Sequence, residues 1–264
     1  MGLVVVARVV VLAGVEEEAG NMNFKEILGV RIDGLSLAEA QQKAREFLPS
    51  GQHKIYTPNP EFLVKAQKDE NFKKVLNSSD LNLCDGFGLQ MASGIKRIPG
   101  VDFMIELCEI AAEQGRGVYL LGSGNDEVIH KTAENLLKKF SNLKIAGMDK
   151  GPKINENQDG TISVENNETI LEKINQTGAE IIFVAFGMGK QEKWIYENLT
   201  KLPNIKIAMG VGGAFDYISG VVKRAPSLIR NLGLEWLYRV IKQPSRLVRI
   251  YNATIKFLFL SVFK

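Results

Sequence analysis

The sequence predicts an α/β protein: a Rossmann-like, mostly parallel sheet flanked by helices, with a small N-terminal β-hairpin and a C-terminal helical appendage that binds membranes. Two observations predict the sheet. The chain of 264 residues, 45% of them apolar, can bury one substantial core. In addition, six short aliphatic runs end in turns bearing Gly, Asn or Asp, and a helical stretch often follows. These runs are Lys54–Thr57, Leu81–Cys84, Gly117–Leu121, Leu143–Ala146, Glu180–Phe186 and Ile205–Met209.

The N-terminal elements follow from local patterns. Residues 1–21 contain an apolar run too short for a membrane span of roughly 18–20 residues, and we interpret them as a leader or an extension of unknown role. Phe24–Asp33 alternates as a strand pair would, with Gly29 at the turn. Ser36 and Glu39 are spaced as a capping box, which predicts a helix that begins after Ser36.

The last 42 residues differ in charge from the rest of the chain. Residues 223–264 hold nine Lys or Arg and one acidic residue, a net +8, whereas the whole chain carries +3 and residues 1–222 therefore −5. A basic, apolar and aromatic helical pattern is typical of a segment that lies on an anionic lipid surface. We therefore expect a catalytic α/β domain over 22–222 and a basic amphipathic helical appendage over 223–264. The expected membrane contacts are Trp236, Arg239, Arg246 and Arg249.

Several classes of protein are disfavoured. Two cysteines, Cys84 and Cys108, do not make a disulfide scaffold. No DxD motif and no His, Asp or Glu cluster with metal spacing occurs, so we expect neither a metal nor another cofactor. The cations of the appendage alternate with a dense aliphatic face, which favours lipid over nucleic acid as the partner. The polar, turn-rich region 150–168 is expected to be an exposed excursion.

The predicted chemistry lies in the turns that follow the strands. Ligands bind open parallel sheets outside the carboxyl ends of the strands. Here those turns are rich in glycine, which lets the backbone approach an anion, and several lead into helix N-termini, which favour phosphate. The pattern suits a diphosphate, although it contains neither a full GxxxxGK[ST] loop nor the third glycine of the dinucleotide fingerprint. Asp85, directly after one strand, is either a general base or a helix cap.

A series of motifs resembles the WecG/TagA/CpsF glycosyltransferases from about Phe24 to Tyr251. Within that family the likeness is greatest to the N-acetylmannosamine transferases of wall teichoic acid synthesis. One departure is Gly189, which stands where members of the family often carry proline. The motifs are Thr57-Pro58-Asn59-Pro60-Glu61, Asp85-Gly86-Phe87-Gly88, Arg97-Ile98-Pro99-Gly100-Val101-Asp102, Gly187-Met188-Gly189-Lys190-Gln191-Glu192-Lys193-Trp194, Gly212-Gly213-Ala214-Phe215-Asp216, Arg224-Ala225-Pro226 and Gly233-Leu234-Glu235-Trp236-Leu237-Tyr238-Arg239.

The resemblance implies an inverting, metal-independent transferase. Its donor would be UDP-N-acetylmannosamine, its acceptor N-acetylglucosamine linked to undecaprenyl diphosphate, and its product a β-1,4 linkage. It also implies a peripheral protein at the cytoplasmic face of the cell membrane. Two alternatives stay open, namely a transferase of the same family with another UDP-sugar donor, and a non-catalytic module that binds a nucleotide sugar or lipid. A homo-oligomer is a further open alternative.

The family's motifs also imply roles for individual residues. Asp85 would be the general base that takes the proton of the acceptor hydroxyl. Asp216 would contact the nucleoside or act as a structural cap. Arginine pairs well with phosphate oxygens, and the arginines implied for the diphosphate of donor or acceptor are Arg97, Arg224 and Arg230. The other donor-binding residues implied are Thr57, Asn59, Gly122, Gly124, Asn125, Gln191, Gly212 and Gly213.

Overall fold

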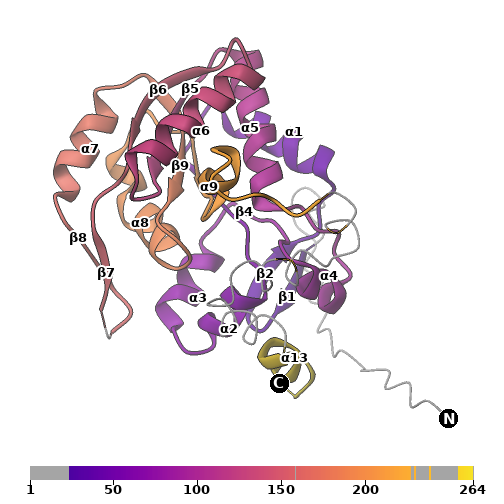
Figure 1. The fold of residues 1–264 in the computed structure, drawn as a ribbon. Helices are drawn as coiled ribbons and strands as arrows, with labels where there is room; N and C mark the ends of the chain where they lie inside the picture. Colours follow the sequence, from indigo (N-terminus) through magenta and orange to yellow (C-terminus); the bar gives the residue numbers. More distant parts are fainter. Residues whose placement is uncertain (1–23, 158, 227–228, 230–237, 239–254, 264) are drawn as a thin grey trace.

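The centre of the molecule is a six-stranded sheet in the order β4-β3-β10-β9-β5-β6, with every pairing parallel (Figure 1). The computed structural model describes residues 24–157, 159–226, 229, 238 and 255–263. The six predicted aliphatic runs form this sheet, which confirms its parallel class. Its strands are β3 (His53–Tyr56), β4 (Leu81–Asn82), β5 (Gly117–Gly122), β6 (Lys144–Asp149), β9 (Ala179–Ala185) and β10 (Ile207–Gly210).

Helices cover both faces of the sheet, because its strands are apolar on both sides. Along β9, Ile181 and Phe183 belong to one core and Ile182 and Val184 to the other, as the alternation of side chains in a strand requires. One core is closed by α1 (Leu37–Phe47), α5 (Gly100–Gln114), α6 (Asp126–Lys139) and α9 (Ala214–Ile218). The other is closed by α2 (Pro60–Ala66), α3 (Glu70–Asn77), α4 (Phe87–Ser93), α7 (Asn167–Asn175), α8 (Lys190–Asn198) and the 3₁₀ turn η1 (Leu199–Lys201).

The N-terminal hairpin confirms the local prediction. Strands β1 (Phe24–Ile27) and β2 (Val30–Asp33) pair antiparallel around Leu28 and Gly29, whose φ angles are +53° and +76°. The capping box before α1 is also confirmed, since Glu39 N donates to Ser36 Oγ and Ser36 N donates to the Glu39 carboxylate. Asp33 attaches the hairpin to the sheet by accepting a hydrogen bond from Asn82 N at 2.7 Å.

The polar excursion contains a second hairpin that the sequence analysis did not predict. Strands β7 (Ile154–Glu156) and β8 (Ile162–Val164) pair antiparallel within it. A fully buried lysine of α8, Lys193, anchors this hairpin: its Nζ donates to Glu156 Oε1 at 2.8 Å and to Asp69 Oδ2 of the loop before α3 at 2.7 Å. The excursion is therefore fixed to the body by a buried cation.

The C-terminal helix α13 (Phe257–Phe263) packs on the body of the protein against α2 and α4 (Figure 1). Phe257 is fully buried and belongs to the same core as α2, α3 and α8. The remainder of the predicted appendage lies almost entirely outside the described residues, as do residues 1–21. No helix in the described part of the chain combines the length and the apolar content that crossing a bilayer requires.

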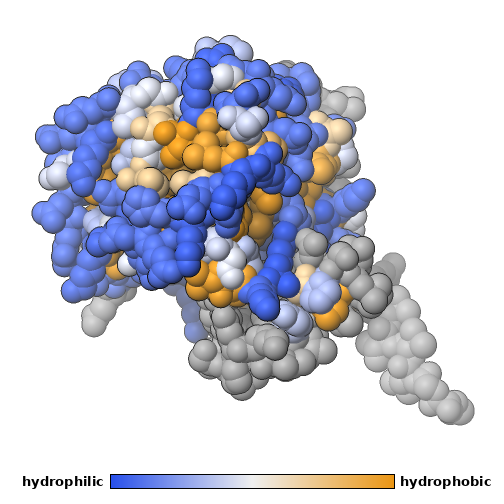
Figure 2. All heavy atoms as spheres, turned by 45° about the horizontal axis from the view of Figure 1, so that its top comes forward, coloured by the Kyte–Doolittle hydropathy of each residue, from blue (hydrophilic) through white to orange (hydrophobic). Residues whose placement is uncertain are grey.

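The surface is mainly hydrophilic over the helices that Figure 2 turns toward the viewer, with a hydrophobic area near the centre of that face.

Candidate active site

The sheet brings five of the predicted site residues to the edge where its strands end. Across the sheet, Asp85 follows β4, Thr57 follows β3, Gly212 follows β10, Gln191 opens the helix after β9, and Gly122 ends β5. This is the edge at which open parallel sheets bind ligands. The arrangement follows from the parallel direction of the strands.

Asp85 and Thr57 lie together at the N-terminus of α5. The backbone N–H of Asp85 donates to the carbonyl oxygen of Pro58 at 2.9 Å, which joins the two loops. The Oδ2 atom of Asp85 accepts from the backbone N–H of Gly100, the first residue of α5, at 3.3 Å. Gly100 is closely packed here, because a Cβ atom on it would lie 2.8 Å from Thr57 Oγ1. A half-buried carboxylate, a hydroxyl and a helix N-terminus therefore form one cluster.

The two roles considered for Asp85 are compatible in this geometry. The helix that directly follows it, α4, has Gly86 as its N-cap and receives no side-chain cap. Asp85 instead contacts the first turn of α5, whose partial positive charge favours a carboxylate. An ionised carboxylate has two oxygens with about four lone-pair sites, so this contact leaves it able to accept a further proton.

Arg97 belongs to the surroundings of the same cluster. Burial, and then the neighbouring Asp85 charge, raise the pKa of the Cys84 thiol to about 12, while a hydrogen bond with Ser93 and the charge of Arg97 act in the opposite direction. Both charges must therefore lie near Cys84. The backbone N–H of Arg97 also donates to Gln90 Oε1 of α4 at 3.2 Å. With its pKa raised, Cys84 stays a neutral thiol at physiological pH and is a poor candidate for a nucleophile.

Two predicted donor-binding residues act as helix N-caps. Asn59 Oδ1 accepts from the backbone N–H groups of the first turn of α2, at 2.9 Å from Glu61 N. Asn125 Oδ1 does the same for α6, at 2.8 Å from Glu127 N. In each residue the side-chain oxygen accepts the capping hydrogen bonds. The side-chain NH₂ is therefore the group that Asn59 or Asn125 would offer to a ligand.

The turn after β5 has an unusual backbone. Gly122, Ser123 and Gly124 all have positive φ angles, of +118°, +76° and +67°. A Cβ atom on Gly122 would lie 2.7 Å from the carbonyl group of Ala185, so close packing requires glycine there. A Cβ atom on Gly124, in contrast, would meet nothing within 4 Å. Gly124 is therefore the position of this turn where a ligand can approach the backbone.

A buried hydrogen-bond network joins the turns after β9 and β10. Gln191, only 2% exposed, accepts from Gly212 N through Oε1 at 2.9 Å and donates through Nε2 to Glu192 Oε1 at 2.6 Å. The second oxygen of Glu192 accepts from Gly189 N at 2.7 Å. Burial raises the pKa of the fully buried Glu192 to about 7. No sequence pattern singled out Glu192, although one of the motifs contains it. The network shows that Gln191 supports the Gly212 turn.

Gly213 and Asp216 lie at the start of α9. Asp216 is half-buried in the first turn, and its backbone oxygen accepts from Val222 N at 3.0 Å and from Ser219 Oγ at 3.1 Å. These bonds close the turn that follows α9, two residues before Arg224.

Arg224 is brought to the cluster by an aspartate that was not assigned a role. Both terminal nitrogens of Arg224 donate to the carboxylate of Asp102 in the first turn of α5, with Nη2 and Oδ2 2.9 Å apart. Asp102 lies two residues after Gly100, so the guanidinium is held close to the helix end that Asp85 contacts. Because Arg224 and Asp102 are 122 residues apart, no local pattern could have paired them.

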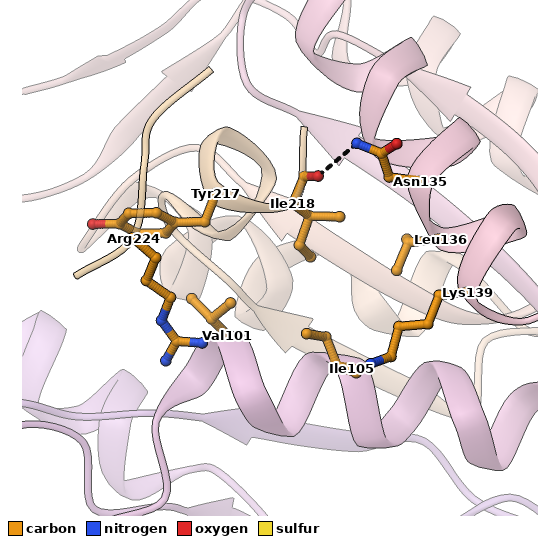
Figure 3. Close-up of a pocket in the computed structure, with 8 residues that line it drawn as sticks. All are labelled: Val101, Ile105, Asn135, Leu136, Lys139, Tyr217, Ile218 and Arg224. Atoms are coloured by element: carbon orange, nitrogen blue, oxygen red, sulfur yellow. Dashed lines mark hydrogen bonds between the residues drawn. The ribbon is translucent and has the colours of Figure 1, made fainter. Parts of the chain in front are cut away.

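Beside Arg224 a pocket of about 250 Å³ opens between α5, α6 and α9 (Figure 3). Arg224 and Val101 lie at one end in that view and Lys139 at the other. The amide of Asn135 is turned to the backbone oxygen of Ile218, to which it donates at 2.9 Å. The remaining walls are mostly apolar: Ile105, Leu136, Tyr217 and Ile218.

Other predicted residues cannot be placed. Arg230, Trp236, Arg239, Arg246 and Arg249 lie outside the described residues. Within the described part of the chain, no group of three or more His, Cys, Asp or Glu side chains is arranged to hold a metal ion.

Comparisons with known proteins match nearly the whole chain. The model of the glycosyl transferase WecG/TagA/CpsF family matches residues 25–264. A Staphylococcus aureus (strain MW2) protein named N-acetylglucosaminyldiphosphoundecaprenol N-acetyl-beta-D-mannosaminyltransferase is 29% identical over 90% of this chain and 92% of its own. A Bacillus subtilis (strain 168) protein of the same name is 35% identical over 75% of each chain.

Proposed function

The chain belongs to the glycosyl transferase WecG/TagA/CpsF family, and from this premise we propose that it is an N-acetylmannosaminyltransferase of wall teichoic acid synthesis. The donor is UDP-N-acetylmannosamine and the acceptor is N-acetylglucosamine linked to undecaprenyl diphosphate. The name shared by the two relatives, each similar over three quarters or more of this chain, supports the sugar and the acceptor. The sugar is transferred with inversion to form a β-1,4 linkage.

The observation that carries the mechanism is the cluster of Asp85, Thr57 and the α5 N-terminus. In the proposed reaction, the acceptor hydroxyl oxygen attacks the anomeric carbon from the face opposite UDP. Its proton passes to the Asp85 carboxylate while the bond from the anomeric carbon to UDP breaks. The contact of Asp85 Oδ2 with Gly100 N, at 3.3 Å, supports this role because it orients the carboxylate at the sheet edge. Thr57 and Asn59, on the neighbouring loop, are proposed to hold the sugar.

The charge of the departing UDP must be balanced by the protein. We assign this to backbone N–H groups of the glycine turns, to the helix N-termini at the sheet edge, and to arginine. The open position at Gly124 and the half-buried guanidinium of Arg224 support the assignment. Arg97 and Arg230 are proposed to take part at the diphosphate of donor or acceptor.

A lipid-linked acceptor places the reaction at a membrane. We therefore propose a peripheral protein of the cytoplasmic face, bound to the anionic surface by the basic residues 223–264. The net charge of +8 on that segment, against −5 on residues 1–222, supports this assignment.

The function is tested by product analysis. The full-length chain is incubated with a short-chain polyprenyl diphosphate carrying N-acetylglucosamine and with one of four UDP-sugars: those of N-acetylmannosamine, N-acetylglucosamine, N-acetylmannosaminuronic acid and glucose. Mass spectrometry should show a disaccharide product with the first donor only. Equal turnover with another donor would reassign the sugar. Binding of UDP without any product would favour a non-catalytic module.

A further inference from the structure

Helix α4 exposes apolar side chains directly beside the candidate base. It begins immediately after Asp85 and Gly86, and its sequence, Phe-Gly-Leu-Gln-Met-Ala-Ser, contains no charged residue. Phe87 is 36% exposed and Met91 is 66% exposed. These two residues are four positions apart, so they lie on one side of the helix. An uncharged helix with two exposed large apolar residues is unusual on a surface that only water contacts.

Helix α13 extends this apolar surface. It contacts α4 and α2, and it buries Phe257 completely in the core. Leu258 and Phe259 of this helix, and Ile255 two residues before it, are 50%, 61% and 60% exposed. Their spacing of three and four residues places them on one face, opposite the side that packs on the body. Like α4, α13 contains no charged residue.

Because α13 contacts α4, we group the exposed large apolar residues of this part of the chain as the α4–α13 surface and define it as Phe87, Met91, Ile255, Leu258 and Phe259. It holds five of the ten exposed large hydrophobic residues of the described chain, although the two helices are short. Phe257 is buried and Leu260 packs against the same core, so the outward position of Leu258 and Phe259 follows from the packing of α13.

Lysine residues flank the two helices in the sequence. Lys256, in the turn that leads into α13, lies next to Lys68 at the end of α2: burial and then the charge of Lys68 lower the pKa of Lys256. Lys96, which follows α4, is exposed. Two like charges held together repel each other, and an anion placed between them removes that cost. Exposed apolar residues with lysines nearby in the sequence suit the interface of an anionic bilayer, where acyl chains lie below phosphate headgroups.

We propose that the α4–α13 surface docks on an anionic lipid bilayer and thereby presents Asp85 to the headgroup layer. This inference rests on the proposed function, because it gives the lipid-linked acceptor a short path to the base. The acceptor's diphosphate stays at the level of the headgroups, and the base lies two residues before Phe87 at the start of α4. The membrane contact thus includes α4, from the middle of the catalytic domain, in addition to the C-terminal segment.

The test compares two matched double variants of the full-length chain. Met91→Gln with Leu258→Gln changes the α4–α13 surface. Met148→Gln with Leu137→Gln makes the same changes at β6 and α6, where these residues are 37% and 41% exposed. Binding to vesicles of phosphatidylglycerol and phosphatidylcholine is measured by flotation. We expect the first pair to weaken binding by roughly tenfold or more, because each side chain loses a large apolar contact, and the control pair to leave binding unchanged.

Three further readouts complete the test. The surface variant and the wild type should transfer sugar to a water-soluble short-chain acceptor at equal rates. If the wild type fails to transfer sugar at all, the proposed function is wrong. The vesicle-binding result still decides whether the α4–α13 surface docks on lipid. Vesicles of phosphatidylcholine alone should bind the wild type more weakly. Equal vesicle binding by the two double variants would overturn the proposal. So would a change in molar mass by light scattering in the surface variant alone, since the surface would then be an interface between two copies of the chain.

Discussion

Replacing the buried Glu192 by glutamine should remove part of the pH dependence of stability. Glu192 is fully buried, and burial raises its pKa from the ordinary 4.5 to about 7. The folded protein therefore binds a proton at this carboxyl group at pH values where the unfolded chain has already released it. Stability from the protonated group is fully present below about pH 4.5 and is lost as the pH rises through about 7.

The magnitude follows from the size of this shift. One pKa unit corresponds to about 1.4 kcal/mol, so the wild type should lose on the order of 3 kcal/mol of unfolding free energy across this window through Glu192 alone. Glutamine keeps the shape and one acceptor oxygen for Gly189 N but carries no charge. The Glu192→Gln variant should therefore show a pH dependence that is smaller by about this amount.

The assay is urea unfolding followed by circular dichroism at about pH 5 and about pH 8, where the carboxyl group is mostly protonated and mostly ionised in the folded state. Glu165→Gln, at an exposed position, is the control and should change with pH as the wild type does. Other titrating groups are common to all three proteins, so the difference between them isolates Glu192. An equal loss of stability in Glu192→Gln and wild type would refute the reasoning.

Three other perturbations have expected outcomes. EDTA should change the transfer rate by less than about twofold, since the sequence carries no DxD motif; a large loss restored by Mg²⁺ or Mn²⁺ would reveal a metal site. Phe257→Ala should cost about 3 kcal/mol of stability and the exposed Leu258→Ala less than about 1 kcal/mol, by urea unfolding; equal costs would contradict the packing of α13. Lys193→Met should cost about 2–4 kcal/mol because it removes the buried cation that Asp69 and Glu156 share, although Glu156 keeps its ion pair with Lys65; a neutral result would argue against this anchor.

Local patterns predicted most of the fold. The alternation around Gly29, the Ser36–Glu39 capping box and the six aliphatic runs each report on a few neighbouring residues, and the structure confirms them. The parallel direction of the strands then predicted that Thr57 and Asp85 would lie at one edge of the sheet. A periodic pattern predicts a helix or strand because the backbone of each element sets where every side chain lies relative to its neighbours in the sequence.

Local sequence patterns could not predict contacts between residues that are far apart in the sequence. The Arg224–Asp102 pair spans 122 residues and the Lys193–Asp69 pair spans 124. Glu192 was overlooked because a charged residue in the first turn of a helix usually lies on the surface, whereas here the helix start is buried. For α13, an apolar run cannot by itself distinguish a segment that packs on a core from one that meets lipid; the structure shows that Phe257 packs on the core.

The most direct test of the central claim is the transfer rate of Asp85→Asn. The carboxylate lies with Thr57 at the start of α5, and asparagine keeps an oxygen for Gly100 N while it removes the basic group. With UDP-N-acetylmannosamine and the short-chain acceptor, we expect a rate reduced by about 10²–10⁴-fold and a nearly unchanged affinity for UDP. A variant that keeps more than about half of the wild-type rate would contradict the assignment of Asp85 as the base.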